Sequence, residues 1–210
     1  MGHMIPVQAP DPRPLPGEPL ALDLLNTQWV ASGSPADLLA TAEGTWAWLA
    51  AAGIAAAATP ETRHALITAR QAIRDVLTAQ GRPEALERFN QVLGHGRLRL
   101  SVGPAANPEQ TLEVDDPAWR PAVMAAADLL EPLKQAPDRI RRCQHPDCVL
   151  WFYDTTRNGT RRWCSMATCG NRAKAHRHYD RAKNRANPAD SENDHQDQAK
   201  AQHRSATRPD

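Results

Sequence analysis

Four cysteines are the residues best suited to chemistry. Cys143 and Cys148 are separated by four residues, as are Cys164 and Cys169, and 15 residues lie between the two pairs. Two close thiol pairs joined by a short segment are typical of one tetrahedral zinc site, and thiolates select zinc over magnesium or calcium. Four thiolates would fill every coordination position, so the spacing predicts one structural zinc ion rather than a catalytic one. An iron–sulfur cluster and four ordinary free thiols are the alternatives.

A strongly basic segment surrounds these cysteines. Residues 139–185 contain 12 Lys and Arg against 3 Asp and Glu, a net charge of +9, whereas residues 1–138 carry −6 and residues 186–210 carry −2. The overall charge of +1 is therefore the sum of an acidic part and a basic segment, and this asymmetry predicts an anionic partner for the basic segment. Arginine and lysine neutralise phosphates, and arginine also binds guanine in the major groove. The residues predicted to contact DNA are Arg161, Arg162, Arg172, Lys174, Arg177, Arg181, Lys183 and Arg185.

The basic segment also has alternative roles that the sequence leaves open. The helix that carries most of these side chains could be solvated, or it could dock on the acidic part of the same chain. Some arginines could simply offset the negative charge of a zinc–thiolate cluster. Zinc could also stabilise a docking surface for an acidic protein.

Polar residues in the apolar segment 20–30 give a second candidate site. Asp23 and Asn26, with Trp29 and Trp46, could line a pocket for a small-molecule effector. The alternative is that Asp23 or Asn26 caps a neighbouring helix and that the tryptophans belong to the core. No nucleophile–base pair, phosphate loop or pair of catalytic carboxylates is evident in the sequence, so we expect no enzyme activity.

The elements around the cysteines resemble a treble clef. Residues 149–154 are rich in strand formers, Asn158 and Gly159 signal a turn, and residues 160–163 are expected to return as the second strand. Ser165 is suited to cap a long helix that continues to about residue 185. The predicted C-terminal fold is thus a β-hairpin followed by a long basic helix.

The N-terminal part is expected to be mainly helical, an α+β fold with one β-hairpin. Apolar spacing and capping residues predict helices over residues 20–30, 41–52, 60–80, 83–93 and 116–135, with a kink at Pro132. Trp46 and Leu86 are expected on buried faces. Residues 98–102 alternate as a half-buried strand, with residues 111–114 as its partner.

Composition sets the domain limits. Prolines at positions 6, 10, 12, 14, 16 and 19 exclude a helix, so residues 1–19 are predicted to be a tag remnant and a mobile proline-rich leader. Residues 20–136 form the helical domain and residues 137–186 the zinc finger. Residues 187–210 lack large apolar side chains and are predicted to be disordered. Without an apolar run of about 18 residues or a secretory signal, we expect a cytoplasmic protein with no membrane span.

A family resemblance follows from these motifs. The stretch from Trp163 to Arg172, WCSMATCGNR, resembles the CGNR zinc-finger family, whose Cys-Gly-Asn-Arg tetrapeptide lies here at 169–172. The first cysteine pair and the FYD stretch at 152–154 are similar to the first half of that finger. Proteins with this finger usually carry an N-terminal ABATE domain, which the LDLLNT stretch at 22–27 resembles.

The resemblance implies a bacterial transcription regulator. Its finger would bind double-stranded DNA, and its helical domain would sense a ligand or mediate assembly. A finger of this size reaches few bases, which favours a homodimer. The rival predictions are a protein-interaction module with a structural zinc finger, and a small-molecule-binding protein that does not bind DNA.

Overall fold

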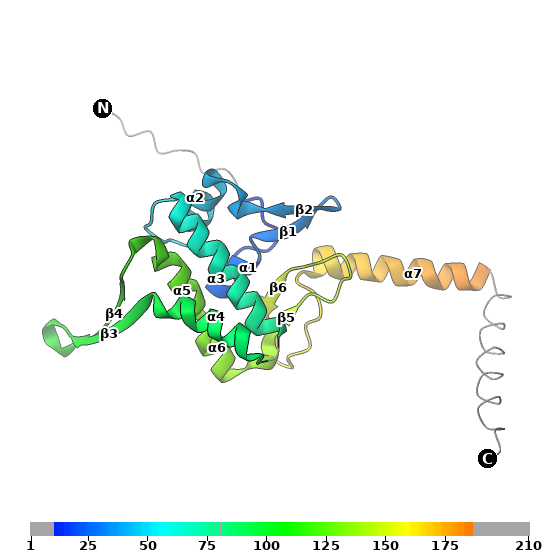
Figure 1. Cartoon of the computed structure of the whole chain (residues 1–210). Coiled ribbons are helices and arrows are strands. Elements are labelled where there is room, and N and C mark those ends of the chain that lie inside the picture. Colours follow the sequence, from blue (N-terminus) through cyan, green and yellow to red (C-terminus); the bar gives the residue numbers. More distant parts are fainter. Residues whose placement is uncertain (1–10, 80, 187–210) are drawn as a thin grey trace, which may run out of the picture. The chain divides into compact units, whose positions relative to one another are not determined.

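The structure is a computed structural model that describes residues 11–79 and 81–186 (Figure 1). Contacts divide the chain into two compact units, with the boundary between Cys164 and Ser165. The predicted tag remnant and the predicted disordered tail lie outside the described residues. No helix in the described ranges is both long enough and apolar enough to cross a membrane.

Helices build most of the core of the first unit. They are α1 (Leu20–Leu25), α2 (Ala42–Ala51), α3 (Pro60–Thr78), α4 (Pro83–Gly94), α5 (Arg120–Asp128) and α6 (Leu130–Gln135). The short helix α1 is buried from Ala21 to Leu25 and contacts both α3 and α5, which also pack against α4. Together with three small hairpins, these helices confirm the predicted α+β fold class.

Capping residues place the helix starts as the sequence predicts. The hydroxyl of Thr59 accepts a hydrogen bond from the Thr62 amide at 3.2 Å, and Pro60 occupies the first turn of α3. Thr41 accepts from the Gly44 amide at 3.0 Å in the same way and starts α2. These two starts are therefore confirmed.

The predicted helix over residues 20–30 is too long. Helix α1 ends at Leu25, and β1 (Gln28–Ala31) follows, paired antiparallel with β2 (Ser34–Asp37). The turn between them places Ser32 and Gly33 at φ of 49° and 84°, the left-handed geometry of a tight hairpin. Trp29 thus lies in a strand, and the N-terminal part has a second hairpin where the sequence predicts only one.

Helix α2 turns a different face to the core than predicted. Trp46 is 45% exposed, whereas Trp48 is fully buried. The helix is apolar around most of its circumference, so its sequence does not single out one face. Gly44 decides the orientation, because a Cβ atom there would lie 1.8 Å from the carbonyl oxygen of Leu38. Leu86, also expected to be buried, is 42% exposed on α4.

The hairpin of β3 (Gly96–Val102) and β4 (Pro108–Val114) has the predicted pairing but not the predicted burial. Leu98 pairs with Leu112, yet Leu98, Leu100 and Val102 are 58%, 69% and 73% exposed. Figure 1 shows the reason, since the hairpin projects away from the helices of the first unit. An alternating pattern gives the period of a strand but does not show what covers its apolar face.

The predicted helix over residues 116–135 is interrupted. A short 3₁₀ turn (Pro117–Trp119) precedes α5, and Leu129 separates α5 from α6. Pro132 cannot donate a backbone hydrogen bond to the preceding turn, which explains the interruption. At the end of α5, the carboxylate of Asp128 accepts a hydrogen bond from the backbone amide of Ala21 at 3.0 Å. This bond ties α5 to α1.

The strand pairing beside the cysteines differs from the prediction. Strand β6 (Trp151–Tyr153) pairs with β5 (Ile140–Arg142), which precedes the first cysteine, and residues 160–163 form no strand. The buried Ile140 lies opposite Tyr153, so the pairing with β5 adds an apolar residue to the core. The turn at Gly159 is present, with φ of 58°.

The second unit starts at a capped turn. The hydroxyl of Ser165 accepts from the amide of Thr168 at 3.4 Å, as predicted, and opens a π turn over Met166–Gly170. Helix α7 (Asn171–Ala186) continues directly from this turn. The side-chain amide of Asn171 donates to the carbonyl oxygen of Ala167 at 3.2 Å, which stabilises the junction.

Candidate metal centre and its supports

The four cysteines form one buried cluster. The four sulfur atoms all lie within 4.8 Å of one another, and all four residues are buried. The Sγ atoms of Cys148 and Cys164 are 3.8 Å apart. Sulfurs at the corners of a tetrahedron around zinc, with Zn–S bonds of about 2.3 Å, lie about 3.8 Å apart. The cluster therefore fits one structural zinc ion held by Cys143, Cys148, Cys164 and Cys169.

The electrostatics of the cluster favour a cation. Without one, the hydrogen bond with Cys143 raises the pKa of Cys148 to about 12 and likewise raises the pKa of Cys164. Hydrogen bonds from Cys148 and Cys164 lower the pKa of Cys143, so a single thiolate is favoured among these three residues. A divalent ion supplies the charge that lets all four thiols ionise. With four sulfur ligands the ion has no open position, so its role is structural.

The β5–β6 hairpin delivers the first cysteine pair. Cys143 follows β5 and donates its amide to the carbonyl oxygen of Leu150 at 2.9 Å. Cys148 donates to the carbonyl oxygen of His145 at 3.0 Å, which closes the turn between the two thiols. Cys164 donates its amide to the Cys143 sulfur at 3.4 Å. These backbone hydrogen bonds hold the cysteine sulfur atoms close together.

A buried carboxylate organises the loop between the cysteine pairs. Asp154 accepts hydrogen bonds from the amide and hydroxyl of Thr156, at 2.9 and 2.6 Å, and from the amide of Arg161 at 2.8 Å. Burial raises the pKa of Asp154, but these hydrogen bonds outweigh it and lower the pKa. The sequence pattern predicts no role for Asp154, although it is the last residue of the FYD stretch.

Arg161 is a structural residue of this loop. Its guanidinium group donates to the backbone carbonyl oxygens of Trp163 and Cys164 and stacks over the Phe152 ring at 4.3 Å. It also lies 3.6 Å from the carboxylate of Glu18. These contacts hold the backbone at a zinc ligand, so the side chain is already engaged within the protein.

The other predicted DNA contacts vary in their surroundings. Arg162 is exposed, and its side chain bonds to Gln144 at 2.7 Å. Arg172 donates to the Cys169 sulfur at 3.5 Å, so it offsets thiolate charge. Lys174, Arg177 and Arg181 are exposed on α7. Lys183 and Arg185 also lie in α7, but their side chains are outside the described part of the chain.

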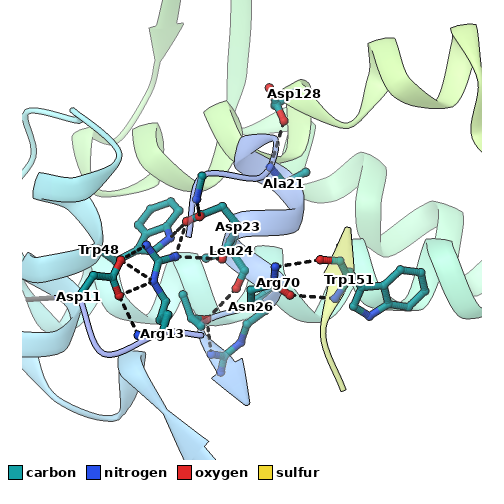
Figure 2. Close-up of polar contacts among 12 residues, drawn as sticks. Asp11, Arg13, Ala21, Asp23, Leu24, Asn26, Trp48, Arg70, Asp128 and Trp151 are labelled. Atoms are coloured by element: carbon teal, nitrogen blue, oxygen red, sulfur yellow. Dashed lines mark hydrogen bonds and ion pairs between the residues drawn. The ribbon is translucent and has the colours of Figure 1, made fainter. Parts of the chain in front are cut away.

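Asp23 bonds to residues of the proline-rich leader (Figure 2). Its carboxylate accepts from the Arg13 guanidinium group, from the Trp48 indole at 2.9 Å and from the Gly17 amide at 2.9 Å. Arg13 is only 5% exposed and also pairs with Asp11. The leader has no helix or strand from residue 11 to residue 19, as predicted, but the prediction of a mobile leader is wrong at Arg13, because this buried ion pair anchors it.

Asn26 joins α1 to the zinc-binding hairpin (Figure 2). Its side-chain amide donates to the carbonyl oxygen of Trp151 and accepts from the amide of Trp151, both at 2.9 Å. The carboxylate of Glu18 accepts a hydrogen bond from the amide of Tyr153, two residues further along β6, at 2.8 Å. These two side chains satisfy the free edge of β6 as a neighbouring strand would.

The predicted ligand-binding set is therefore not brought together. Asp23 and Asn26 are buried and fully engaged inside the protein, and neither caps a neighbouring helix as the alternative supposed. Trp46 is exposed on α2, and Trp29 borders a groove elsewhere. Sequence spacing could not reveal this, because Asn26 and its partner are 125 residues apart.

A helical domain bonded directly to the strands around a closed four-cysteine centre defines a zinc-finger protein. Residues 18–131 match the ABATE family, described as "Putative stress-induced transcription regulator", and residues 139–182 match the CGNR zinc finger. The first match covers more than half of the chain, so the protein belongs to the ABATE family and carries a CGNR zinc finger. A search of curated proteins finds no match to this chain.

Proposed function

We propose that this protein is a bacterial transcription regulator that binds double-stranded DNA through α7. The observation that carries the proposal is a row of exposed cations on that helix. Lys174, Arg177 and Arg181 follow one another at intervals of three and four residues, which places them on the same face. In the described part of the chain, none of the three lies within ion-pair distance of a carboxylate.

The zinc centre supports this proposal by fixing the start of the helix. Cys169 binds the metal in the turn that leads directly into α7, and Ser165 caps that turn. A helix that is anchored at one end by a metal can present its side chains to a groove without losing much conformational entropy on binding. The family description as a transcription regulator agrees with this role.

The remaining parts of the proposal concern setting and assembly. Reduced thiols are maintained in the cytoplasm, which suits a zinc centre built from four cysteines. A single helix contacts few base pairs, so we expect a homodimer on DNA. The closed metal centre and the internally bonded Asp23 and Asn26 give no reason to assign an enzymatic reaction.

Selection of bound fragments from a random duplex pool tests the proposal. We expect the zinc-loaded full chain to enrich a short sequence and to shift it in a gel. The triple variant Lys174→Gln, Arg177→Gln, Arg181→Gln should lose on the order of 100-fold in affinity at 0.1 M salt, because three phosphate contacts are removed.

A matched control separates the α7 surface from charge in general. Arg88, Arg97 and Arg99 are exposed arginines of the first unit, and changing all three to Gln removes the same charge. That control should bind DNA as the wild type does. Equal losses in both variants, or no binding of the wild type to any duplex at low salt, would refute the proposal and favour a protein-interaction module.

A further inference from the structure

A groove of about 450 Å³ in the first unit is not used by the proposed function. The β1–β2 hairpin, α3 and the β5–β6 hairpin contribute its walls. Apolar and aromatic side chains form most of the lining, and two arginines add positive charge, a combination typical of small-molecule sites. The residues that define it are Trp29, Pro35, Val149, Trp151, Arg74 and Arg142.

Carboxylates of the protein offset the positive charge of the groove only in part. Asp37 also borders the groove, but its two oxygens each accept from Arg70 at 2.7 Å. The guanidinium group of Arg74 is half-buried and donates to the neutral side chain of Gln28, at 2.8 Å. Within the described residues, neither Arg74 nor Arg142 has a carboxylate at ion-pair distance. Burial, and then the charge of Arg70, lower the pKa of Arg74 by more than the charges of Asp37 and Asp75 raise it.

We propose that this groove binds a small aromatic carboxylate. Arg74 and Arg142 bind the carboxylate, because guanidinium groups pair with it through two parallel hydrogen bonds. The flat body of the ligand lies against the half-buried ring of Trp29 and the small exposed part of Trp151, which lose little conformational entropy on binding. The groove volume lies in the range of small-molecule sites.

The position of the groove couples it to the metal centre. Arg142 immediately precedes Cys143, and Val149 immediately follows Cys148, so both sides of the first cysteine pair reach the groove. Trp151 is in turn held by Asn26. A bound ligand therefore bridges the helical domain and the hairpin that carries two zinc ligands. Its effect on DNA affinity rests on the proposed function, whereas the binding site itself does not.

Calorimetry on the zinc-loaded full chain tests the site with 2-naphthoate and its neutral counterpart, 2-naphthamide. We expect naphthoate to bind at least tenfold more tightly than the amide. Arg74→Gln and Arg142→Gln should each weaken naphthoate binding at least tenfold. Arg63→Gln should leave it unchanged, because Arg63 lies on the same helix but donates to the Ala40 carbonyl oxygen outside the groove.

Three results would overturn the inference. They are equal binding of the acid and the amide, wild-type affinity in both groove variants, and no measurable heat with millimolar benzoate or naphthoate. Thermal unfolding of each variant shows whether it is folded, and the two arginines are tested separately so that a folding defect in one leaves the other decisive.

Two further measurements separate this inference from the proposed function. Saturating naphthoate should slow zinc transfer to a chromogenic chelator severalfold, and an unchanged rate would contradict the coupling. The triple variant at Lys174, Arg177 and Arg181 should bind naphthoate as the wild type does. Failure of DNA binding alone then refutes the regulator proposal, whereas failure of naphthoate binding refutes the groove.

Discussion

Helices α1 and α7 both carry polar side chains that the sequence marks as functional, but they use them in opposite ways. In α1 and the residue after it, Asp23 and Asn26 are buried, and their side chains bond to other parts of the first unit. In α7, Lys174 and Arg181 are exposed and have no acidic partner among the described residues. The difference teaches that a polar residue in an apolar helix organises the fold, whereas cations on a polar helix are available to a partner.

Loss of a zinc ligand should have the largest effect, because both helices depend on the metal-bound hairpin and turn. We expect Cys164→Ser to abolish zinc binding and to lower the free energy of unfolding by more than about 5 kcal/mol, since metal affinity contributes directly to folding. Metal analysis and urea unfolding measure this. Thr155→Ser, at an exposed loop position, should keep one zinc per chain. Full zinc content in Cys164→Ser would show that the four cysteines do not together hold the metal.

The substitution Asn26→Leu tests whether the buried polar side chains in and beside α1 stabilise the fold. Removing the amide leaves the N–H and C=O groups of Trp151 buried without partners, which costs about 2–4 kcal/mol. Urea unfolding of the zinc-loaded protein gives this value. Asn90→Ala, at an exposed position of α4, should change stability by less than about 0.5 kcal/mol. An Asn26→Leu protein as stable as the wild type would mean that the bond between the domain and the hairpin carries no energy.

A smaller effect is expected on the stability of the protein at acidic pH. Burial raises the pKa of Asp37, but the hydrogen bonds and charge of Arg70 outweigh burial and hold the pKa below its ordinary value of 3.8. The ionised carboxylate therefore contributes stability above that value, and the contribution is lost as the pH falls through the lower folded pKa.

The stability difference between wild type and Asp37→Asn should thus be constant near neutral pH and should shrink below about pH 4. Taking the difference between two zinc-loaded proteins cancels the part caused by acid release of zinc. In an Arg70→Gln background the same substitution should show little of this pH dependence. A difference that grows in acid would contradict the assignment.

The smallest effect on stability is expected on α7. The triple variant Lys174→Gln, Arg177→Gln, Arg181→Gln should unfold within about 0.5 kcal/mol of the wild type, because exposed charges without partners contribute little. The same urea unfolding experiment measures it. A loss of several kcal/mol would show that α7 uses these cations within the protein, as α1 uses Asp23 and Asn26, and would remove the contrast between the two helices.

The sequence predicts most reliably what depends on short spacing. The cysteine set, the helix start at Ser165 and the cap at Thr59 are local patterns, and the structure confirms all three. The pairing of β6 with β5 could not be predicted in this way, because Ile140 and Tyr153 meet across the cysteine turn and no local signal favours this partner over residues 160–163. Strand partners are in general chosen by tertiary burial more than by local propensity.

The partners of buried polar groups are equally hard to predict. Asp23 and Asn26 stand out in the sequence as unusual, but Arg13 and Trp151, which satisfy them, lie 10 and 125 residues away. The buried face of α2 cannot be predicted from its sequence, because that helix is apolar nearly all round and a close approach at Gly44 sets its orientation. The groove between the hairpins needs three separate segments to come together, which only the folded chain shows.

The central claim, that the cations of α7 bind DNA phosphates, is tested most directly by the salt dependence of binding. Fluorescence anisotropy of a labelled duplex with the zinc-loaded full chain should give a linear fall of log K with log salt concentration. The triple variant at Lys174, Arg177 and Arg181 should reduce that slope by about 3, one counterion for each lost phosphate contact, and the control at Arg88, Arg97 and Arg99 should not. An unchanged slope in the triple variant, or no binding at about 50 mM salt, would contradict the account.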